Sequence, residues 1–270
     1  SSATARVPTE PMRLQLLSDL HLETEAFDPQ PAPEAELLVL AGDIDSSWDG
    51  LARFRGWPVP VLFVAGNHEF DRRELREAWP ALRARCESLG IDLLEREERL
   101  LTGRDGRRIR VVATTRWCDF DLFGAAERAR CQRAAGYFVK VMRATRDGRP
   151  FDPEAVREEA LACRDWLAAE LARPCAADAT VVVTHYGPSA RSLDPRYGGQ
   201  PGSASFCNAD DALLPGADLW LHGHLHCRHD YVVEHGPAAP RACTRVVSNA
   251  RGHEGKGESI GHDPLMCISI

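Results

Sequence analysis

The sequence contains no Cys-x-x-Cys pair, no apolar run long enough to cross a bilayer and no excess of basic residues. Its nine cysteines are scattered and odd in number, which is typical of reduced thiols in a cytosolic protein rather than of a disulfide framework. No stretch approaches the roughly 20 apolar residues of a membrane-spanning helix. The formal net charge of −7 argues against a general nucleic-acid binder or an anionic-membrane protein, and leaves room only for a local basic groove. We therefore expect a cytoplasmic protein with no membrane partner.

The sequence also lacks internal repeats, low-complexity segments and the apolar core of a signal peptide. Residues 1–11 are polar, and we expect a flexible N-terminal arm there, with Met12 as a candidate native start. The chain of 270 residues is long enough for one large domain with a substantial core, or for two small ones. We expect one domain over residues 12–270.

Five short apolar runs each end in residues that ligate metals. The runs are rich in Val and Leu, which is typical of strands buried on both faces. In chain order they end in Asp19-Leu20-His21, Gly42-Asp43, Gly66-Asn67-His68-Glu69, His185 and His222-Gly223-His224-Leu225-His226. Because ligands of open α/β sheets gather at the carboxyl ends of the strands, we expect these five groups to meet in space.

Helical patterns alternate with the apolar runs, which predicts an α/β fold. Residues 71–89 carry apolar side chains at helical spacing, and Pro153 opens a second helix that extends to about residue 171. Residues 117–150 are rich in Arg and Ala, and we expect a helical insertion there, with its helix over 121–146, close to the active site. After residue 229 the pattern changes to short strands, which predict a closing antiparallel section.

A pair of divalent metal ions fits these donors. Asp19 and His21 are two residues apart at a strand end, so both project to the same side and can bind one cation. Two dications at about 3.5–4 Å repel each other, so a carboxylate must bridge them, and Asp43 is the best candidate. Two dications, two carboxylates and a bridging hydroxide sum to about +1, which suits an anionic phosphate ester. Donors without thiolate fit Mn, Fe, Zn or Co, and the sequence does not choose among them.

The five motifs together resemble the calcineurin-like metallophosphoesterase superfamily, from about Met12 to the end of the chain. The resemblance implies a four-layer α-β-β-α sandwich with a dimetal site at the strand ends. It further implies that Asp19, His21 and His226 bind the first metal, and that Asp43 bridges. Asn67, His185 and His224 would bind the second metal, and His68 would bind phosphate and protonate the leaving oxygen. The pieces Trp117-Cys118-Asp119-Phe120, Thr184-His185-Tyr186-Gly187-Pro188-Ser189 and Ser248-Asn249-Ala250-Arg251-Gly252 resemble a bacterial branch of small soluble phosphohydrolases.

Reasoning from the residues agrees on His68. Consecutive loop residues point in different directions, so Asn67 and His68 are not expected to be ligands together. A histidine beside a cationic pair is well placed as a general acid. The protein Ser/Thr phosphatases of the superfamily carry an acid three residues after the bridging aspartate, where this chain has Ser46. Either Asp45 or another acid orients His68, or none does.

Other polar residues near the motifs are weaker candidates. We expect Tyr186 and Arg251 to contact substrate, as well as Asn67 and His68. His222 is expected to support the ligands from behind, and Glu69 either to support them or to begin the following helix. Four further histidines lack partner spacing and are expected to be ordinary surface residues: His229, His235, His253 and His262.

The function expected from these features is hydrolysis of phosphate mono- or diesters of small substrates by a metal-bridging hydroxide, with His68 as general acid. One alternative is a phosphodiesterase or nuclease that acts on nucleotides or nucleic acid, although the net charge makes nucleic acid an unfavourable partner. Another is a metal-binding scaffold without activity. The physiological substrate and the oligomeric state do not follow from the motifs.

Overall fold

The computed structural model describes residues 10–270, so most of the arm predicted over 1–11 lies outside the described residues. The first sheet has five strands in the order β13-β1-β2-β3-β4. Its strands are β1 (Arg13–Leu17), β2 (Leu37–Leu40), β3 (Val61–Phe63), β4 (Ile91–Leu93) and β13 (Cys267–Ser269). Strands β1 to β4 are parallel, and β13 joins β1 antiparallel. The motifs after β1, β2 and β3 therefore leave the sheet at the same edge.

The second sheet has six strands in the order β11-β12-β10-β9-β6-β5. Its strands are β5 (Glu97–Thr102), β6 (Arg108–Thr114), β9 (Ala179–Thr184), β10 (Leu219–His222), β11 (Arg228–Glu234) and β12 (Cys243–Asn249). The four inner strands are parallel, and the edge strands β5 and β11 are antiparallel to their neighbours. Strand β5 is charged and half-exposed, so its sequence shows no apolar run.

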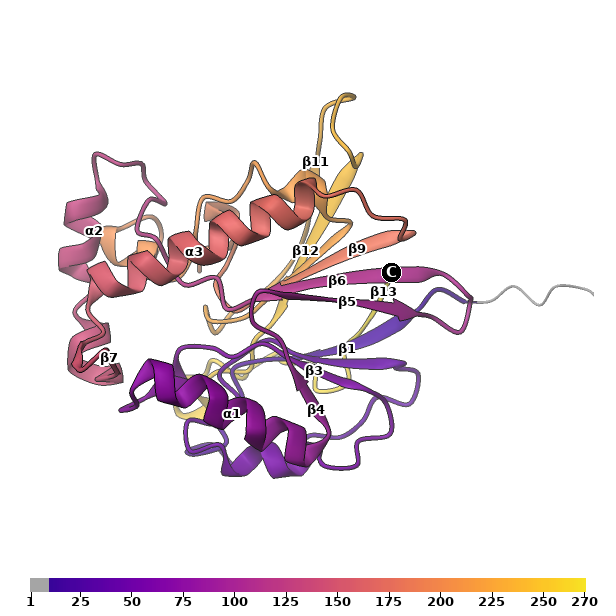
Figure 1. Ribbon diagram of the computed structural model, residues 1–270, viewed down its shortest axis with the longest axis horizontal. Helices are drawn as coiled ribbons and strands as arrows, with labels where there is room; N and C mark the ends of the chain where they lie inside the picture. The colour runs from indigo at the N-terminus through magenta and orange to yellow at the C-terminus, as the bar shows by residue number, and fades with distance from the viewer. Residues whose placement is uncertain (1–9) are drawn as a thin grey trace, which may run out of the picture.

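The two sheets pack face to face through apolar side chains that alternate along the strands. Leu16 and Val39 of the first sheet belong to the same buried cluster as Val181 and Leu221 of the second. Helix α1 (Leu75–Leu89) covers the outer face of the first sheet, and α3 (Pro153–Ala172) covers that of the second (Figure 1). This arrangement confirms the predicted four-layer α-β-β-α sandwich.

Local signals account for the helix ends. Asp152 accepts a hydrogen bond from the amide of Ala155, and Pro153 occupies the first turn, as the sequence indicates for α3. Helix α1 begins at Leu75 rather than near residue 71. The chain before it forms a 3-10 turn over His68–Phe70, and Arg72 has a φ of 59°, which a continuous helix does not allow.

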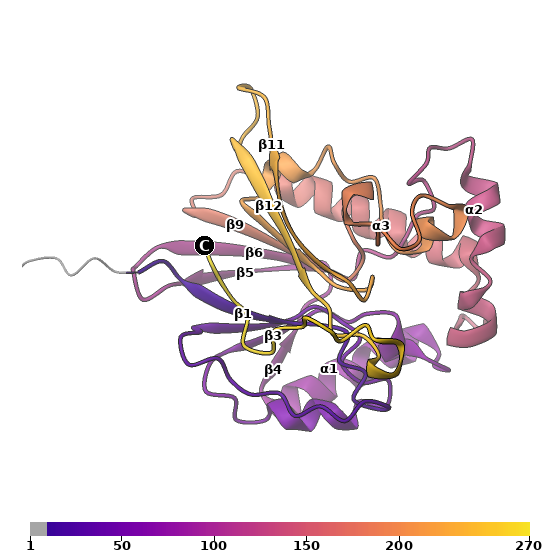
Figure 2. The same ribbon diagram turned by 180° about the vertical axis from the view of Figure 1, so that it is seen from behind.

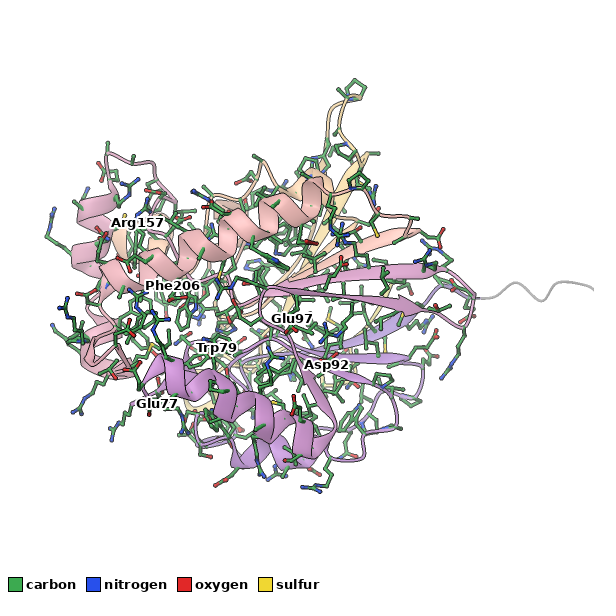
Figure 3. The ribbon with its side chains drawn as sticks, in the orientation of Figure 1. Glu77, Trp79, Asp92, Glu97, Arg157 and Phe206 are labelled. Carbon is green, nitrogen blue, oxygen red and sulfur yellow. The ribbon has the colours of Figure 1, made fainter. Side chains whose placement is uncertain are left out.

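The insertion is helical over shorter stretches than predicted. In place of one helix over 121–146, the structure has α2 (Arg128–Ala134), a single π-helical turn over Phe138–Met142 and a small hairpin of β7 (Thr145–Arg146) and β8 (Arg149–Pro150). Arg143, with a φ of 52°, ends the helical turn. Helix α2 packs beside the 3-10 turn Pro201–Ser205 (Figure 2). Arg157 of α3 binds Asp121 at 2.7 Å and ties the insertion to the sandwich (Figure 3).

None of the helices over residues 10–270 combines the length and apolarity needed to cross a bilayer. The nine cysteines in this range are free thiols, and five of the nine are buried.

A buried arginine holds the ends of several elements together next to the site. Arg116 follows β6 and is fully buried; it forms ion pairs with Asp210 at 2.9 Å and with Asp119 at 2.8 Å. It also donates to the backbone carbonyl of Ala160 in α3. Loss of this guanidinium would leave two buried carboxylates without a counter-charge.

We therefore expect Arg116→Met to lower the free energy of unfolding by about 3–5 kcal/mol, because the substitution leaves two buried carboxylates without a counter-charge. Urea denaturation measures this change. Arg245→Met is the matched control: its partner Asp230 and Arg245 itself are both more than a third exposed, so we expect at most about 1 kcal/mol there. Equal losses in the two variants would contradict the structural role of Arg116.

Candidate metal centre

The structure brings the predicted ligands together from both sheets. One donor atom each from Asp19, His21, Asp43 and His226 lie within 4.8 Å of one another. A second group with the same limit consists of Asp43, His185 and His224, so Asp43 belongs to both. Asn67 follows Gly66, and a side chain at Gly66 would lie 2.2 Å from an oxygen of Asp43 and 2.7 Å from the ring of His185. The seven residues thus meet where the strand ends of the two sheets face each other.

Five of these residues have left-handed backbone conformations, with φ between 47° and 71°: Asp19, His21, Asp43, His224 and His226. This conformation costs an L-residue roughly 1–2 kcal/mol. Strain of this kind concentrates at functional sites. Gly42 has a φ of 91°, and its lack of a side chain leaves room for His185. A side chain at Gly42 would lie 2.2 Å from the ring of His185.

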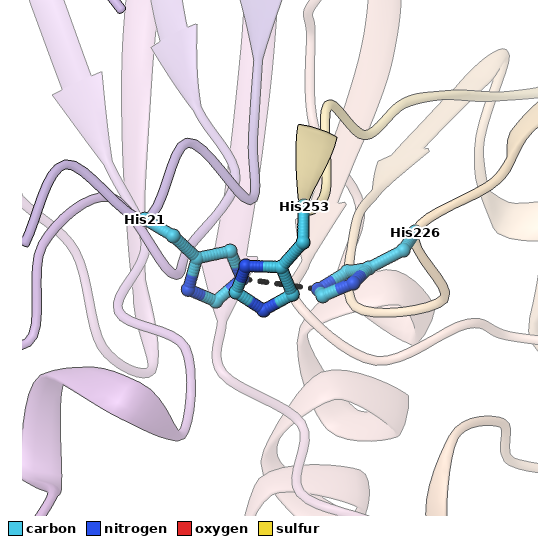
Figure 4. Close-up of side chains that lie close together, drawn as sticks. All are labelled: His21, His226 and His253. Carbon is cyan, nitrogen blue, oxygen red and sulfur yellow. Dashed lines mark hydrogen bonds between the residues drawn. The ribbon is translucent and has the colours of Figure 1, made fainter. Parts of the chain in front are cut away.

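The imidazole hydrogen bonds leave nitrogen lone pairs directed into the site. His185 donates from Nδ1 to the carbonyl of Ala41 at 2.7 Å, so in its neutral form the ring carries a lone pair on Nε2. His226 Nδ1 lies 2.7 Å from Glu258, and His21 Nδ1 lies 3.3 Å from Glu23. The Nε2 atoms of His21 and His226 face each other at 3.0 Å (Figure 4). Carboxylates that hold the outer nitrogen of a histidine are typical of metal ligands.

The atoms that lack partners fit a bound cation. Three buried donor atoms have no hydrogen-bond partner among the described residues: Asp43 Oδ2, Asn67 Oδ1 and His185 Nε2. A buried polar atom without a partner is costly, and a metal ion satisfies all three. The Nε2 atoms of His21 and His226, 3.0 Å apart, could both bind one such ion.

Charge and burial favour the metal-binding protonation state at two of the predicted ligands, Asp43 and His224. Burial opposes the charge of His185, but the carboxylate of Asp43 raises the pKa of His185 to about 9. Burial alone would raise the pKa of Asp43, but the neighbouring imidazoles of His185 and His68 hold it well below its usual range. Burial lowers the pKa of His224 well below the usual value, so this ring is neutral. An ionised carboxylate and a neutral imidazole are the forms that bind metals.

Glu69 holds the loops after β2 and β3 in place. Its buried carboxylate accepts backbone N–H groups of Asp43 at 3.0 Å, Ile44 at 2.7 Å, Asp45 at 3.3 Å and Gly66 at 2.6 Å. One side chain therefore satisfies four amide groups in two loops that carry predicted ligands. Of the two roles expected for Glu69, the structure favours the supporting one.

His68 lies at the edge of the ligand groups and has a carboxylate partner. Its Nδ1 is 2.7 Å from Asp71 Oδ2, and its Nε2 is 2.8 Å from the hydroxyl of Tyr137 in the insertion. Asp45 instead accepts from Ser47 and Gly50 within its own loop. The acid beside His68 is thus Asp71. Burial opposes the charge of His68, but the carboxylates of Asp43 and Asp71 raise the pKa of His68 to about 10.

Comparison with known proteins agrees with this geometry. The model of the calcineurin-like phosphoesterase family matches residues 12–228. The chain belongs to this family. It is therefore a metal-dependent phosphoester hydrolase.

A solved structure agrees in fold. Phosphopantetheinyl hydrolase from Mycobacterium tuberculosis superposes with a TM-score of 0.71 at 18% identity, over 98% of this chain and 97% of that chain. A dimetal phosphatase from Danio rerio gives a TM-score of 0.46 at 12% identity, over 90% of this chain and 88% of that chain. No curated protein matches the chain.

Two residues predicted to contact substrate lie away from the open part of this phosphoesterase site. Tyr186 is fully buried, and its ring packs against His224 at 4.2 Å between centroids. Arg251 is 6% exposed and pairs with Glu25 at 3.2 Å and Glu254 at 3.4 Å. Neither lines the cavity described below, and their substrate contacts stay predictions. His222 has hydrogen-bond partners at both nitrogens, Ser192 and the carbonyl of Gly223, so it lies behind the ligands as expected.

One histidine expected at the surface belongs to the site instead. His253 stacks on His21 with 4.5 Å between ring centroids, and one ring nitrogen each of His21, His226 and His253 lie within 4.8 Å of one another (Figure 4). Glu25 holds Nδ1 of His253 at 3.0 Å. His253 follows the end of β12, which is a sixth strand end with polar residues after it. That pattern was the signal in the sequence for a place of His253 in the site.

A cavity of about 570 Å³ opens beside the ligands. Its polar lining includes Asp43, His68, His224, His226 and His253. The insertion and residues 193–206 form most of the remaining lining. The cavity is therefore large enough for a phosphoester with a sizeable organic group.

We expect Glu69→Gln to destabilise the protein even without metal. Its amide nitrogen cannot accept the two N–H groups that one carboxylate oxygen accepts now, and two unsatisfied buried donors cost about 2–6 kcal/mol together. Urea denaturation in the presence of a chelator measures this loss. Glu77→Gln, on the exposed face of α1 (Figure 3), is the matched control and should change nothing measurable. An unchanged unfolding midpoint for Glu69→Gln would rule out the clamp.

Proposed function

We propose that this protein hydrolyses phosphate mono- or diesters with two divalent ions, one in each ligand group, and with Asp43 as the bridge. The observation that carries the proposal is the position of the Asp43 carboxylate, which belongs to both groups and keeps one oxygen without a hydrogen-bond partner. Its other oxygen accepts the backbone N–H of His68 at 2.9 Å, which fixes the orientation of the carboxylate.

The ligands divide between the ions by their positions. Asp19, His21 and His226 would hold one ion, and Asn67, His185 and His224 the other, with Asp43 shared. When bound, the ions would polarise the phosphoryl oxygens and supply the hydroxide nucleophile. The donor set has imidazole, carboxylate and amide groups without thiolate, which suits Mn, Fe, Zn or Co.

His68 would act as the general acid. Asp71 accepts the Nδ1 proton of His68, and its carboxylate favours the protonated ring. Its Nε2 proton then points at the hydroxyl of Tyr137. We propose that the leaving oxygen of the substrate takes up the place near this hydroxyl and accepts the proton there.

The alternatives have less support. A scaffold without activity would have no need for an imidazole held between an acid and a phenol, as His68 is here. A substrate screen with manganese-loaded protein should contain phosphomonoesters, diesters and cyclic nucleotides. It should also contain an ester of phosphopantetheine, because the structural neighbour from Mycobacterium tuberculosis is named for that group.

We expect Asp43→Asn to lower the occupancy of both metal positions, because the amide has no charge to offset two dications. Elemental analysis after manganese loading measures this: the wild-type protein should bind two ions per chain, and the variant fewer than one. Asp49→Asn, an exposed residue in the following turn, should leave the metal content unchanged. Two ions retained by Asp43→Asn would rule out the bridge.

We expect His68→Ala to keep both metals and to lose about 10²- to 10⁴-fold in turnover on an alkyl phosphate. The loss should be smaller on a nitrophenyl phosphate, because that leaving group departs without a proton. His235→Ala, on the β11-β12 hairpin, is the control and should be active on both. Equal losses of His68→Ala on the two esters would exclude the acid role and leave only phosphate binding.

A further inference from the structure

The cavity beside the ligands has an apolar side that the proposed chemistry does not use. We define the apolar wall as Tyr137, Phe138, Val141, Leu193, Tyr197 and Phe206. The first three come from the insertion and the last three from the loop after β9. These two segments lie side by side at one end of the molecule (Figures 1 and 2).

Several side chains of the apolar wall are exposed although they are large and hydrophobic. Tyr197 is 61% exposed, Val141 55% and Phe206 41%. Phe206 also stacks on His224, a predicted ligand, with 4.9 Å between ring centroids, so the wall begins at the metal centre. Figure 3 labels Phe206 at the end of the molecule that carries the insertion. Exposed apolar side chains that adjoin a polar site are typical of a ligand-binding surface.

The charges around the apolar wall are compensated. Arg196 is bound by Asp194 at 2.6 Å, and Glu258 by His226 at 2.7 Å. Lys256 is the one cavity-lining cation without an ion pair among residues 10–270. A polyphosphate chain would therefore meet a single free cation along this surface. An uncharged group has no charge to desolvate and could lie on the surface without that cost.

The position of His68 decides which part of a substrate would lie there. His68 is the proposed general acid, and its Nε2 faces Tyr137, the first residue of the apolar wall. The leaving oxygen must be near His68, so the group attached to that oxygen extends past Tyr137 along the wall. The phosphoryl group itself stays with the ligands.

We infer that the substrate is a phosphoester whose leaving group is an uncharged, mainly apolar arm that lies along the apolar wall. This inference rests on the proposed function and specifies its substrate class. It places the selectivity of the enzyme in the insertion and in residues 193–206, away from the ligands.

The test compares two aryl phosphates of nearly equal leaving-group acidity, 4-methylphenyl phosphate and 4-hexylphenyl phosphate, with the manganese-loaded full chain. Burial of the five additional methylene groups on the apolar wall favours binding of the hexyl ester. We expect kcat/KM to be about 10- to 100-fold higher for the hexyl ester, chiefly through a lower KM.

Val141→Asp should reduce this hexyl preference at least fivefold, because a carboxylate would then stand on the apolar wall. Val139→Asp is a close control: Val139 belongs to the same helical turn and is 45% exposed, but it does not line the cavity. Val139→Asp should keep the wild-type preference. Both variants should keep the wild-type metal content, and Val139→Asp should also keep the wild-type activity on the methyl ester.

The outcomes separate the inference from the proposed function. Equal kcat/KM values for the two esters in the wild-type protein, or equal effects of Val141→Asp and Val139→Asp, would overturn the apolar arm while hydrolysis of phosphoesters stands. No hydrolysis of either ester by metal-loaded protein would contradict the proposed function, and the inference would fall with it.

Discussion

The carboxylate of Asp43 is the group on which the rest of the site depends. Its backbone amide is bound by Glu69, and one of its oxygens is occupied by the amide of His68. The second oxygen lies 3.2 Å from His185, on the opposite sheet, without a hydrogen bond. Both sheets therefore bring polar atoms to one buried place, and a bound cation there would make that arrangement favourable. The candidate metal centre requires the packing of the two sheets, because neither sheet alone carries a full ligand group.

The backbone conformations at the site cost free energy, which the surrounding fold must offset. Five ligand residues adopt left-handed backbone conformations, each unfavourable by roughly 1–2 kcal/mol. The four amides held by Glu69 and the buried guanidinium of Arg116 fix the loops from two directions. A rigid frame of this kind keeps ligand atoms within reach of one another before any ion binds. It also explains why polar side chains with no contact to substrate are buried so close to the site.

Local patterns in the sequence predicted an α/β fold whose strand ends meet, and the resemblance to the family predicted the four-layer sandwich. An apolar run followed by a donor residue marks a strand end, and parallel strands bring such ends together. Contacts between distant segments have no such pattern. Asp71 reaches His68 through a 3-10 turn that shortens the predicted helix, and Tyr137 reaches it from the insertion, which is not one continuous helix. Arg251 has a suitable charge, yet its carboxylate partners could be seen only in three dimensions.

The proposed reaction and the proposed selectivity depend on different parts of the chain. Ligands and the proposed acid come from strand ends, whose positions are fixed by the packing of two sheets. The opposite side of the cavity comes mostly from the insertion and from residues 193–206, which lie outside the two large sheets. Tyr137 belongs to both parts, because its hydroxyl contacts His68 while its ring lines the cavity. A change in the insertion can therefore alter the accepted leaving group without moving a ligand, provided that this one phenol keeps its place.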